Sequence, residues 1–322
     1  MSEQLKSGLK PLTPTPTEAV SQPVNWQLEQ IVDELRAVRA EWRSGTGRAR
    51  ELVGRELPSR QAMANIVDGL IGALFPMRLG PSNLRQESED FYVGHTLDNA
   101  LNCLLIQVRL ELAYAARQRG DEGATEAQAV AIVRDFASAL PAMRRLLDSD
   151  VIAAYNGDPA ARSVDEVLLC YPGVLAVIHH RLAHHLYRAG LPLLARIAAE
   201  QAHSATGIDI HPGAQIGHSF FIDHGTGVVI GETAIIGNNV RIYQAVTLGA
   251  KRFTADETGQ LHKGQPRHPI VEDDVVIYAG ATILGRITLG KGSTIGGNVW
   301  LTRSVPAGSN VSQATAQSQP AS

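Results

Sequence analysis

The chain is short of cysteine, and this shortage excludes a disulfide-stapled secreted domain. Only two of its 322 residues are cysteines, Cys103 and Cys170, and both lie in apolar segments of helical character. Small secreted domains rely on many paired cysteines, whereas reduced thiols are the rule in the cytoplasm. We therefore expect two buried, inert thiols in a cytoplasmic protein, and no cysteine nucleophile.

Excess positive charge and long apolar runs are also missing. The net charge is −3 and the isoelectric point is near 6.4, which argues against a nucleic-acid partner. No apolar run reaches about 18 residues, the length at which a membrane-spanning helix becomes a candidate. Residues 1–25 lack the apolar stretch of a signal peptide and are rich in Pro, Thr and Ser. The sequence thus predicts no nucleic acid and no membrane among its partners.

What the sequence does contain, from Ile210 onward, is an aliphatic residue at every sixth position. A helix repeats every 3.6 residues and a strand every 2, so neither explains a sustained period of six. A parallel β-helix does, because each hexad forms one flat side, three hexads complete a coil, and stacked coils bury an apolar column. The repeated positions are Ile210, Ile216, Ile222, Val228, Ala234, Val240 and Val246, then Val271, Ile277, Ile283, Leu289, Ile295 and Leu301.

The residues before this repeat follow a helical pattern. Apolar side chains recur at three- and four-residue spacing, broken by Pro and Gly. The predicted helices include Trp26–Trp42, Val93–Arg117, Glu126–Leu147 and Leu191–His203. We therefore predict an α+β chain with an all-α domain over 26–205 and a parallel β-helix over 206–311, between disordered tails at 1–25 and 312–322.

One long interruption divides the hexads. The interval from Val246 to Val271 exceeds four hexads by a single residue, so the phase slips, and the middle of this stretch is polar. We predict a loop over 250–268 that leaves one corner of the β-helix. Long excursions from a compact scaffold are often functional, although a tolerated surface insertion is the plain alternative.

Three histidine motifs mark the candidate site. Asp209-Ile210-His211-Pro212 opens the repeat, Asp223-His224-Gly225-Thr226-Gly227 follows, and Arg267-His268-Pro269 ends the loop. A histidine beside an aspartate is a natural general base, because the carboxylate fixes the tautomer and stabilises the imidazolium. Solvated corner residues are the plain alternative for each motif. The pairs His179-His180 and His184-His185 have a spacing that could bind zinc, but we favour a polar helix face packed under the β-helix.

Taken together, these motifs resemble the serine O-acetyltransferases, a family of hexapeptide-repeat acyltransferases in cysteine biosynthesis. The resemblance is carried by Asp-Ile-His-Pro at 209–212, Asp-His-Gly-Thr-Gly at 223–227, Gly-Glu-Thr at 231–233, Val-Thr-Leu-Gly at 246–249 and Arg-His-Pro at 267–269. It implies a helical domain before a left-handed β-helix, and transfer of acetyl from acetyl-CoA to the hydroxyl of L-serine. Acetyl-CoA would be a substrate, and no metal is expected.

The resemblance also implies residue roles. His224 matches the general base and Asp209 the carboxylate that orients it. The residues matching the serine site are Asp158, Asp223, Arg267 and His268, and those matching the coenzyme A groove are Gly249, Ala279 and Gly280. A guanidinium suits the carboxylate of serine, and a carboxylate suits its ammonium. Asp209 and His224 are separated by less than one full coil of three hexads, so their contact would have to occur around a corner.

The resemblance implies partners as well. Family members form homotrimers, or dimers of trimers, with active sites between neighbouring prisms. Members that dock onto the sulfhydrylase use a C-terminal Ile, whereas this chain ends in Ser322, so we expect a weak cysteine synthase complex or none. The basic residues of loop 250–268 suggest that it holds the phosphates of the coenzyme or covers the site.

Three other functions stay open on the residues alone. One is a hexapeptide acyltransferase for another hydroxyl or amino acceptor. Another is a β-helical carbonic anhydrase, for which His211, His218, His224 and His268 are available as ligands. The last is a scaffold without catalytic activity. The helical region with Asp158 argues against the first, and the Asp-His-Gly and Arg-His-Pro contexts fit acyl transfer better than metal binding.

Overall fold

The structure of the protein is a computed structural model that describes residues 25–45, 57–120, 126–251 and 264–313. The predicted tails and the middle of the predicted loop therefore lie largely outside the described residues. The chain forms two compact units, Met1–Arg55 and Glu56–Ser322. In the first unit the structure describes one long helix, α1 (Leu28–Gly45). Among the described helices, none is both long and apolar enough to cross a membrane.

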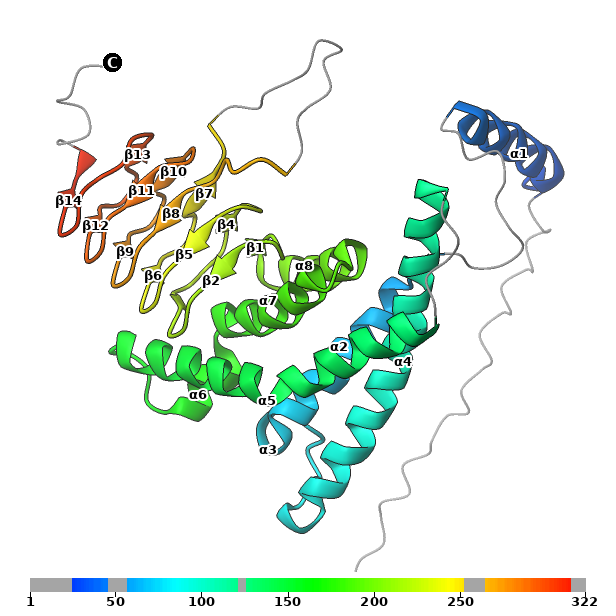
Figure 1. The fold of residues 1–322 in the computed structure, drawn as a ribbon, viewed down its shortest axis with the longest axis horizontal. Helices are drawn as coiled ribbons and strands as arrows, with labels where there is room; N and C mark the ends of the chain where they lie inside the picture. The colour runs from blue at the N-terminus through cyan, green and yellow to red at the C-terminus, as the bar shows by residue number, and fades with distance from the viewer. Residues whose placement is uncertain (1–24, 46–56, 121–125, 252–263, 314–322) are drawn as a thin grey trace, which may run out of the picture. The chain divides into compact units, whose positions relative to one another are not determined.

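The second unit begins with helices (Figure 1). They are α2 (Arg60–Leu74), α3 (Pro76–Leu79), the short 3-10 helix η1 (Gln86–Ser88), α4 (Glu89–Arg119), α5 (Glu126–Gly157), α6 (Val164–Cys170), α7 (Pro172–Arg188) and α8 (Pro192–Thr206). Helix α5 continues well beyond the predicted end at Leu147, because Val151 and Ala154 prolong its buried face. Helix α8 ends at Gly207, which adopts the left-handed conformation that a residue with a side chain rarely takes.

The two cysteines lie on these helices, and the prediction that both are buried was wrong. Cys103 of α4 is only partly buried, and Cys170 is exposed. Cys170 is the last residue of the short helix α6, in which Val167 is the residue that packs into the core. The apolar sequence around Cys170 therefore reflects the single buried side chain of this helix, whereas the Cys170 thiol lies on the solvent-facing side of the helix.

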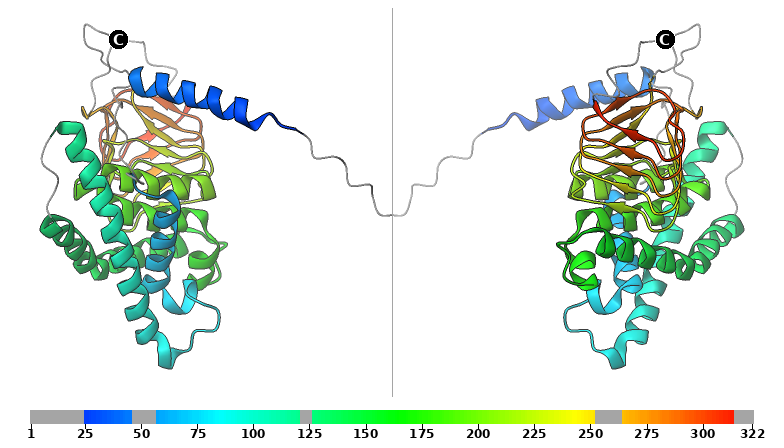
Figure 2. Two further views of the ribbon diagram at one scale, coloured as in Figure 1. Left: turned by 90° about the vertical axis from the view of Figure 1, so that its right-hand side faces the viewer. Right: turned by 90° about the vertical axis from the view of Figure 1, so that its left-hand side faces the viewer.

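Among the described residues, fourteen short strands follow in three parallel sheets. Sheet A contains β1 (Asp209–Ile210), β4 (Val229–Ile230), β7 (Thr247–Gly249), β10 (Thr282–Leu284) and β13 (Trp300–Leu301). Sheet B contains β2 (Gln215–Ile216), β5 (Ile235–Ile236), β8 (Ile270–Val271) and β11 (Thr288–Leu289). Sheet C contains β3 (Phe221–Ile222), β6 (Arg241–Ile242), β9 (Val276–Ile277), β12 (Thr294–Ile295) and β14 (Asn310–Val311). Strands β1 to β12 enter the three sheets in rotation. This is the predicted left-handed β-helix, a three-sided prism whose stacked coils are visible in Figure 2.

A column of aliphatic side chains fills the prism. In sheet A, Ile230 pairs with Leu248, Leu248 with Ile283, and Ile283 with Leu301, one coil above the next. All four are buried. Each coil covers the apolar side chains of its neighbour, so the period of six predicted from the sequence is the period of this column.

The coils differ in length, and the prediction of a single phase from Ile210 to Val246 was wrong at one corner. Ile210 pairs with Ile230, and Ile230 pairs with Leu248, so the first of these two coils is longer by two residues. The two extra residues lie between β3 and β4, in the segment around His224. The coil that includes the loop runs from Ile236 to Val271 and is almost twice as long as each of these two coils.

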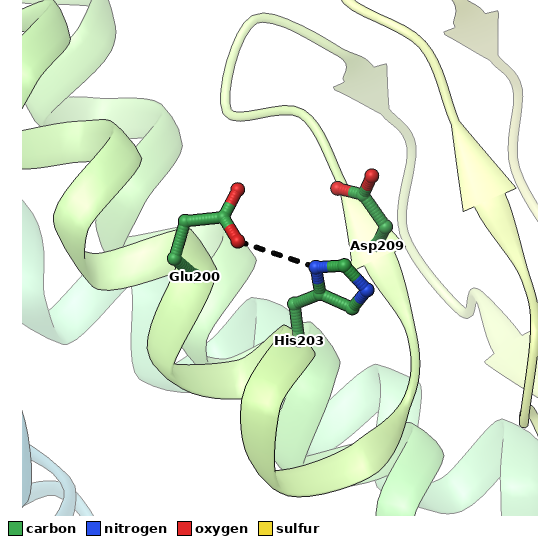
Figure 3. Close-up of side chains that lie close together, drawn as sticks. All are labelled: Glu200, His203 and Asp209. Atoms are coloured by element: carbon green, nitrogen blue, oxygen red, sulfur yellow. Dashed lines mark hydrogen bonds and ion pairs between the residues drawn. The ribbon is translucent and has the colours of Figure 1, made fainter.

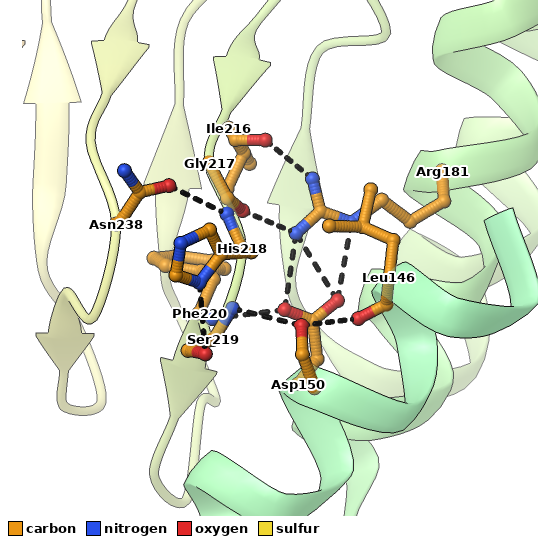
Figure 4. A network of polar contacts seen from close by, with 10 residues as sticks. Leu146, Asp150, Arg181, Ile216, Gly217, His218, Ser219, Phe220 and Asn238 are labelled. Carbon is orange, nitrogen blue, oxygen red and sulfur yellow. Dashed lines mark hydrogen bonds and ion pairs between the residues drawn. The ribbon is translucent and has the colours of Figure 1, made fainter. Parts of the chain in front are cut away.

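A buried ion pair joins the helices to the first coil (Figure 4). The Nη2 atom of Arg181 in α7 lies 3.1 Å from Oδ2 of Asp150 in α5, and the two side chains are 5% and 4% exposed. Arg181 also donates to the carbonyls of Ile216 and Gly217, and Asp150 accepts from the backbone N–H of Phe220. Burial raises the pKa of Asp150 to about 6, although the charge of Arg181 opposes this shift. The pair fixes α5 and α7 against the segment that leads into β3.

Candidate active site

The predicted base lies at the enlarged corner. The segment 223–228 connects β3 of sheet C to β4 of sheet A, and we call the row of such corners between these two sheets the CA edge. His224 has φ +58°, a left-handed conformation that costs energy for a residue with a side chain. Its side chain is 69% exposed, and its Nδ1 lies 3.7 Å from Oδ1 of the largely buried Asp223. The ring is thus presented to solvent with a carboxylate beside it.

Asp158 lies near this corner, just beyond the end of α5. Its carboxylate accepts hydrogen bonds from the Tyr171 hydroxyl and from the backbone N–H of Ala160. The hydrogen bond from Tyr171 lowers the pKa of Asp158 most, and the backbone hydrogen bond from Ala160 and the positive charge of Arg241 add to the effect. The same hydrogen bond raises the pKa of Tyr171 to about 12. Asp158 is therefore held as an anion next to the candidate base.

Arg241 fixes the turn that carries Asp158. This residue of β6 donates from Nη2 to the carbonyl oxygen of Gly157, and its guanidinium lies 5.2 Å from the ring centre of Phe221. A side chain at position 157 would collide with this guanidinium, which explains the glycine. Arg241 and Tyr171 were not predicted from the sequence, because each stands alone there without a motif around it.

A second group of polar residues lies where sheet A meets sheet B, along the row of corners that we call the AB edge. The Nη2 atom of Arg267 lies 2.7 Å from Oε2 of Glu232. The other oxygen of this carboxylate accepts a hydrogen bond of 3.0 Å from the Tyr187 hydroxyl. Glu232 therefore holds the guanidinium of Arg267 in place from one side. It belongs to the Gly-Glu-Thr motif at 231–233, which could have identified it as a site residue.

His268 is buried beside Arg267. Its Nδ1 accepts a hydrogen bond from the backbone N–H of Thr233, so the neutral ring carries its proton on Nε2. Burial lowers the pKa of His268 to about 4, and the positive charge of Arg267 contributes to this shift. Gly231 lies directly against the ring, where any side chain would collide with it. His268 is accordingly a neutral hydrogen-bond donor at neutral pH.

Asp209, the predicted orienting carboxylate, has different neighbours from those expected. At the start of β1 it lies close to Glu200 and His203 of α8 (Figure 3). One carboxylate oxygen of each acidic residue and one ring nitrogen of His203 all lie within 4.8 Å of one another. His203 Nδ1 is 3.2 Å from Oε2 of Glu200. In the described part of the chain, no hydrogen bond or ion pair joins Asp209 to His224, and the carboxylate that contacts this ring belongs to Asp223.

The residues predicted for the coenzyme groove fall on both edges. Ala279 and Gly280 lie on the CA edge, above His224, in a backbone ladder. In this ladder Ala245 N–H donates to Thr226, Gly280 N–H to Gln244, and Asn298 N–H to Ala279. Gly280 has φ +72°, and a side chain there would collide with Asn298. Gly249 ends β7 toward the AB edge, where its carbonyl accepts from Gly285.

The predicted site residues therefore divide between two edges of the same prism. Asp223, His224, Ala279 and Gly280 lie on the CA edge with Asp158 nearby, and Gly249, Arg267 and His268 lie on the AB edge. Sheet A separates the two edges. In one chain, the candidate base His224 and the candidate carboxylate-binding Arg267 lie on different edges, so they do not face a common substrate.

The histidines considered for metal binding are also dispersed. His218 lies between sheets B and C, His224 on the CA edge, and His211 and His268 toward the AB edge. On α7, His180 is buried, and His184 Nδ1 lies 2.8 Å from the Pro212 carbonyl oxygen. As predicted, this face of α7 packs under the first coil.

Known proteins that resemble this chain agree with one another. Residues 268–303 match the family model described as bacterial transferase hexapeptide (six repeats). A plasmid-encoded serine acetyltransferase of Synechococcus elongatus is 63% identical over 266 residues, which cover 81% of this chain and 83% of that protein. A serine acetyltransferase of Mycobacterium tuberculosis is 50% identical over 185 residues, covering 56% of this chain and 75% of that protein.

Solved structures agree with these relatives. Serine acetyltransferase 1 of Entamoeba histolytica, in complex with L-cysteine, is 40% identical with a TM-score of 0.67 and covers 77% of this chain and 86% of its own. The serine acetyltransferase of Neisseria gonorrhoeae, in complex with serine, is 28% identical with a TM-score of 0.50 and covers 78% of this chain and 94% of its own.

Proposed function

The chain belongs to the serine acetyltransferase family of hexapeptide-repeat enzymes, and from this membership we propose how its residues carry out the reaction. The activity is transfer of an acetyl group to the hydroxyl of L-serine, which gives O-acetylserine for cysteine biosynthesis. The acyl donor in this proposal is acetyl-CoA.

His224 acts as the general base. Its exposed ring removes the proton from the serine hydroxyl as the oxygen attacks the thioester carbonyl. The tetrahedral intermediate then collapses, the C–S bond breaks, and the imidazolium returns the proton to the departing thiolate. No covalent enzyme intermediate is required. Asp223, whose Oδ1 lies 3.7 Å from Nδ1 of the ring, stabilises the imidazolium. For Asp209 to orient the ring, as the resemblance implies, its carboxylate would have to turn away from Glu200 and His203.

Serine is recognised through its two charged groups. Arg267 binds the carboxylate. Its Nη2 is held by Glu232, whereas its Nη1 donates a long hydrogen bond of 3.4 Å to the carbonyl of Gln265, which the substrate can replace. Asp158, kept ionised by Tyr171, binds the ammonium. The neutral ring of His268 donates a hydrogen bond from Nε2 to a serine oxygen. This set of charges selects a zwitterionic acceptor over a sugar hydroxyl.

The coenzyme arm follows the prism edge. The CA edge above His224 presents small residues, including Ala279 and Gly280, so an extended pantetheine chain can lie against the backbone there. This direction would place the thioester beside the base. The predicted contribution of loop 250–268 to phosphate binding stays a prediction, since the middle of the loop lies outside the described residues.

The complete site is shared between copies of the chain. A base on the CA edge and an arginine on the AB edge meet when the CA edge of one prism faces the AB edge of the next. Repeating this heterologous contact around a threefold axis gives a closed trimer with three equivalent sites. The helical region can in addition join two such trimers. The division of the site residues between two edges is the observation that supports this assembly.

The observation that carries the proposed function is the exposed His224 ring beside Asp223, at a corner lengthened by two residues, in a chain of this family. The test is a thiol-release assay with purified protein, a panel of acyl-CoAs, and L-serine, L-homoserine and amino sugars as acceptors. We expect release of coenzyme A with acetyl-CoA and L-serine together. Release with an amino sugar but not with L-serine would contradict the proposal.

A further inference from the structure

Helix α1 is apolar along one side, yet it buries none of these side chains. It has 18 residues, and none of them is buried. Leu28, Ile31, Leu35 and Val38 are each between 44% and 62% exposed. A row of large apolar side chains in water is costly, so an exposed stripe of this kind marks an interaction surface.

The spacing of these residues is that of a coiled coil. From Leu28 the stripe advances by three to Ile31, by four to Leu35, by three to Val38 and by four to Trp42. This places Leu28, Leu35 and Trp42 at heptad position a, and Ile31 and Val38 at position d. Apolar residues that alternate by three and four along a helix form the a/d seam that packs against a second helix with the same seam.

The charged residues beside the seam match a parallel neighbour. In this register Glu34 occupies position g and Arg39 the position e of the next heptad. In a parallel coiled coil these two positions face each other across the interface, which places a carboxylate opposite a guanidinium. An antiparallel neighbour would instead bring Glu34 toward Glu41, another g position, and the like charges would repel. The seam therefore suits parallel copies of itself.

The residue types at the seam also indicate how many helices associate. Leucine at a with β-branched residues at d favours three or four strands over two. Val32 at position e widens the apolar face on one side, as a third helix requires. We propose that α1 forms a parallel three-stranded coiled coil with the α1 helices of two further copies of this chain.

The length of α1 explains why this contact depends on the rest of the molecule. Eighteen residues span about 27 Å at 1.5 Å per residue, and an isolated helix of this length is marginal in water. Copies already joined through their prisms hold their α1 helices at a high effective concentration, which favours the bundle. The bundle would then add stability to the assembly without contributing to catalysis.

Disulfide cross-linking of the full-length chain tests the proposal. In a Cys103→Ser, Cys170→Ser background, Leu35→Cys places a thiol in the seam, and Ala40→Cys places one at position f on the opposite face. Under mild oxidation we expect at least about tenfold more covalently linked chains from Leu35→Cys, because thiols at position a approach each other within disulfide distance. Equal yields at the two positions, or no linked chains at position 35, would overturn the proposal.

Charge reversal in the Leu35→Cys chain tests the orientation. In the parallel bundle Glu34→Arg opposes Arg39 and lowers the cross-linking yield, and adding Arg39→Glu restores it. In an antiparallel arrangement position 34 faces Glu41, so Glu34→Arg would not lower the yield, and that result would refute the parallel bundle. The high effective concentration rests on the prism assembly of the proposed function, but neither experiment uses enzymatic activity as its readout, so failure of the bundle and failure of the proposed function are distinguishable.

Discussion

At the scale of single residues, the proposed acetyl-transfer mechanism depends on His224. We predict that His224→Ala lowers kcat by about 10²–10⁴-fold, the usual contribution of a general base, with a small effect on the KM for serine. The melting temperature should change little, because the side chain is 69% exposed. Steady-state kinetics and thermal unfolding measure the two effects. His218→Ala, at an exposed corner between sheets B and C, is the matched control and should retain full activity.

Arg267 tests substrate recognition separately from chemistry. Arg267→Lys keeps the charge but loses the planar guanidinium, so we predict a rise of about 10–100-fold in the KM for serine. The KM for acetyl-CoA should stay within about twofold, because the guanidinium contacts serine and not the acyl donor. Glu232→Gln should give a smaller rise, since it loosens the guanidinium without removing it. An equal rise in both Michaelis constants for Arg267→Lys would contradict the assignment.

His268 makes the folded state sensitive to acid. Its pKa is lowered to about 4 in the folded protein from an ordinary value of 6.5, so between these values the unfolded chain binds more protons. Its contribution to stability is fully present above pH 6.5 and is lost as the pH falls toward 4. We predict that His268→Asn makes the melting temperature depend less steeply on pH across this window. An unchanged slope would show that the ring is not held neutral by its surroundings.

At the scale of elements, the ion pair between α5 and α7 joins the helices to the prism. Asp150→Asn leaves the charge of Arg181 buried without a counter-charge, which costs about 3–5 kcal/mol. We predict a large drop in melting temperature at fixed protein concentration. The exposed pair Arg78–Asp165 provides the control, because solvent screens it and Asp165→Asn should change the melting temperature little. A double variant, Asp150→Leu with Arg181→Leu, should lose less than Asp150→Asn, since no unpaired charge stays buried.

The elements also show how far the sequence alone could lead. The period of six predicted the prism, because one aliphatic column determines both the repeat and the fold. It could not locate the two extra residues of the first coil, since Val228, Ala234, Val240 and Val246 keep the period of six from Ile222. These four residues are buried next to the corners, whereas the strands pair through positions two residues later, such as Ile230 and Leu248. A period of six alone does not distinguish the buried position at a corner from the buried position in the strand that follows it.

At the same scale, the sequence marked candidate site residues but did not predict their arrangement. The Asp-His-Gly and Arg-His-Pro motifs marked His224 and Arg267, because each motif is local. Their placement on different edges depends on the number of residues in each coil, which only the three-dimensional register reveals. Tyr171 and Arg241 could not be found from sequence, since they reach Asp158 and Gly157 through tertiary contacts.

At the scale of the whole molecule, the proposed assembly has a consequence for mixtures of inactive chains. A His224→Ala chain lacks the base but keeps the arginine, and an Arg267→Ala chain lacks the arginine but keeps the base. If each site takes its base from one copy and its arginine from the next, then mixed trimers contain some intact sites. Random mixing of equal amounts would restore about a quarter of the sites in a closed ring.

Co-expression of these two variants with different tags, followed by tandem purification and the thiol-release assay, is therefore the most direct measurement. We expect the mixed assemblies to show at least about a quarter of the wild-type activity, well above either variant alone. If mixed assemblies form and their activity stays at the level of the parent variants, then the base and the arginine do not meet across neighbouring prisms, and the proposed site is wrong.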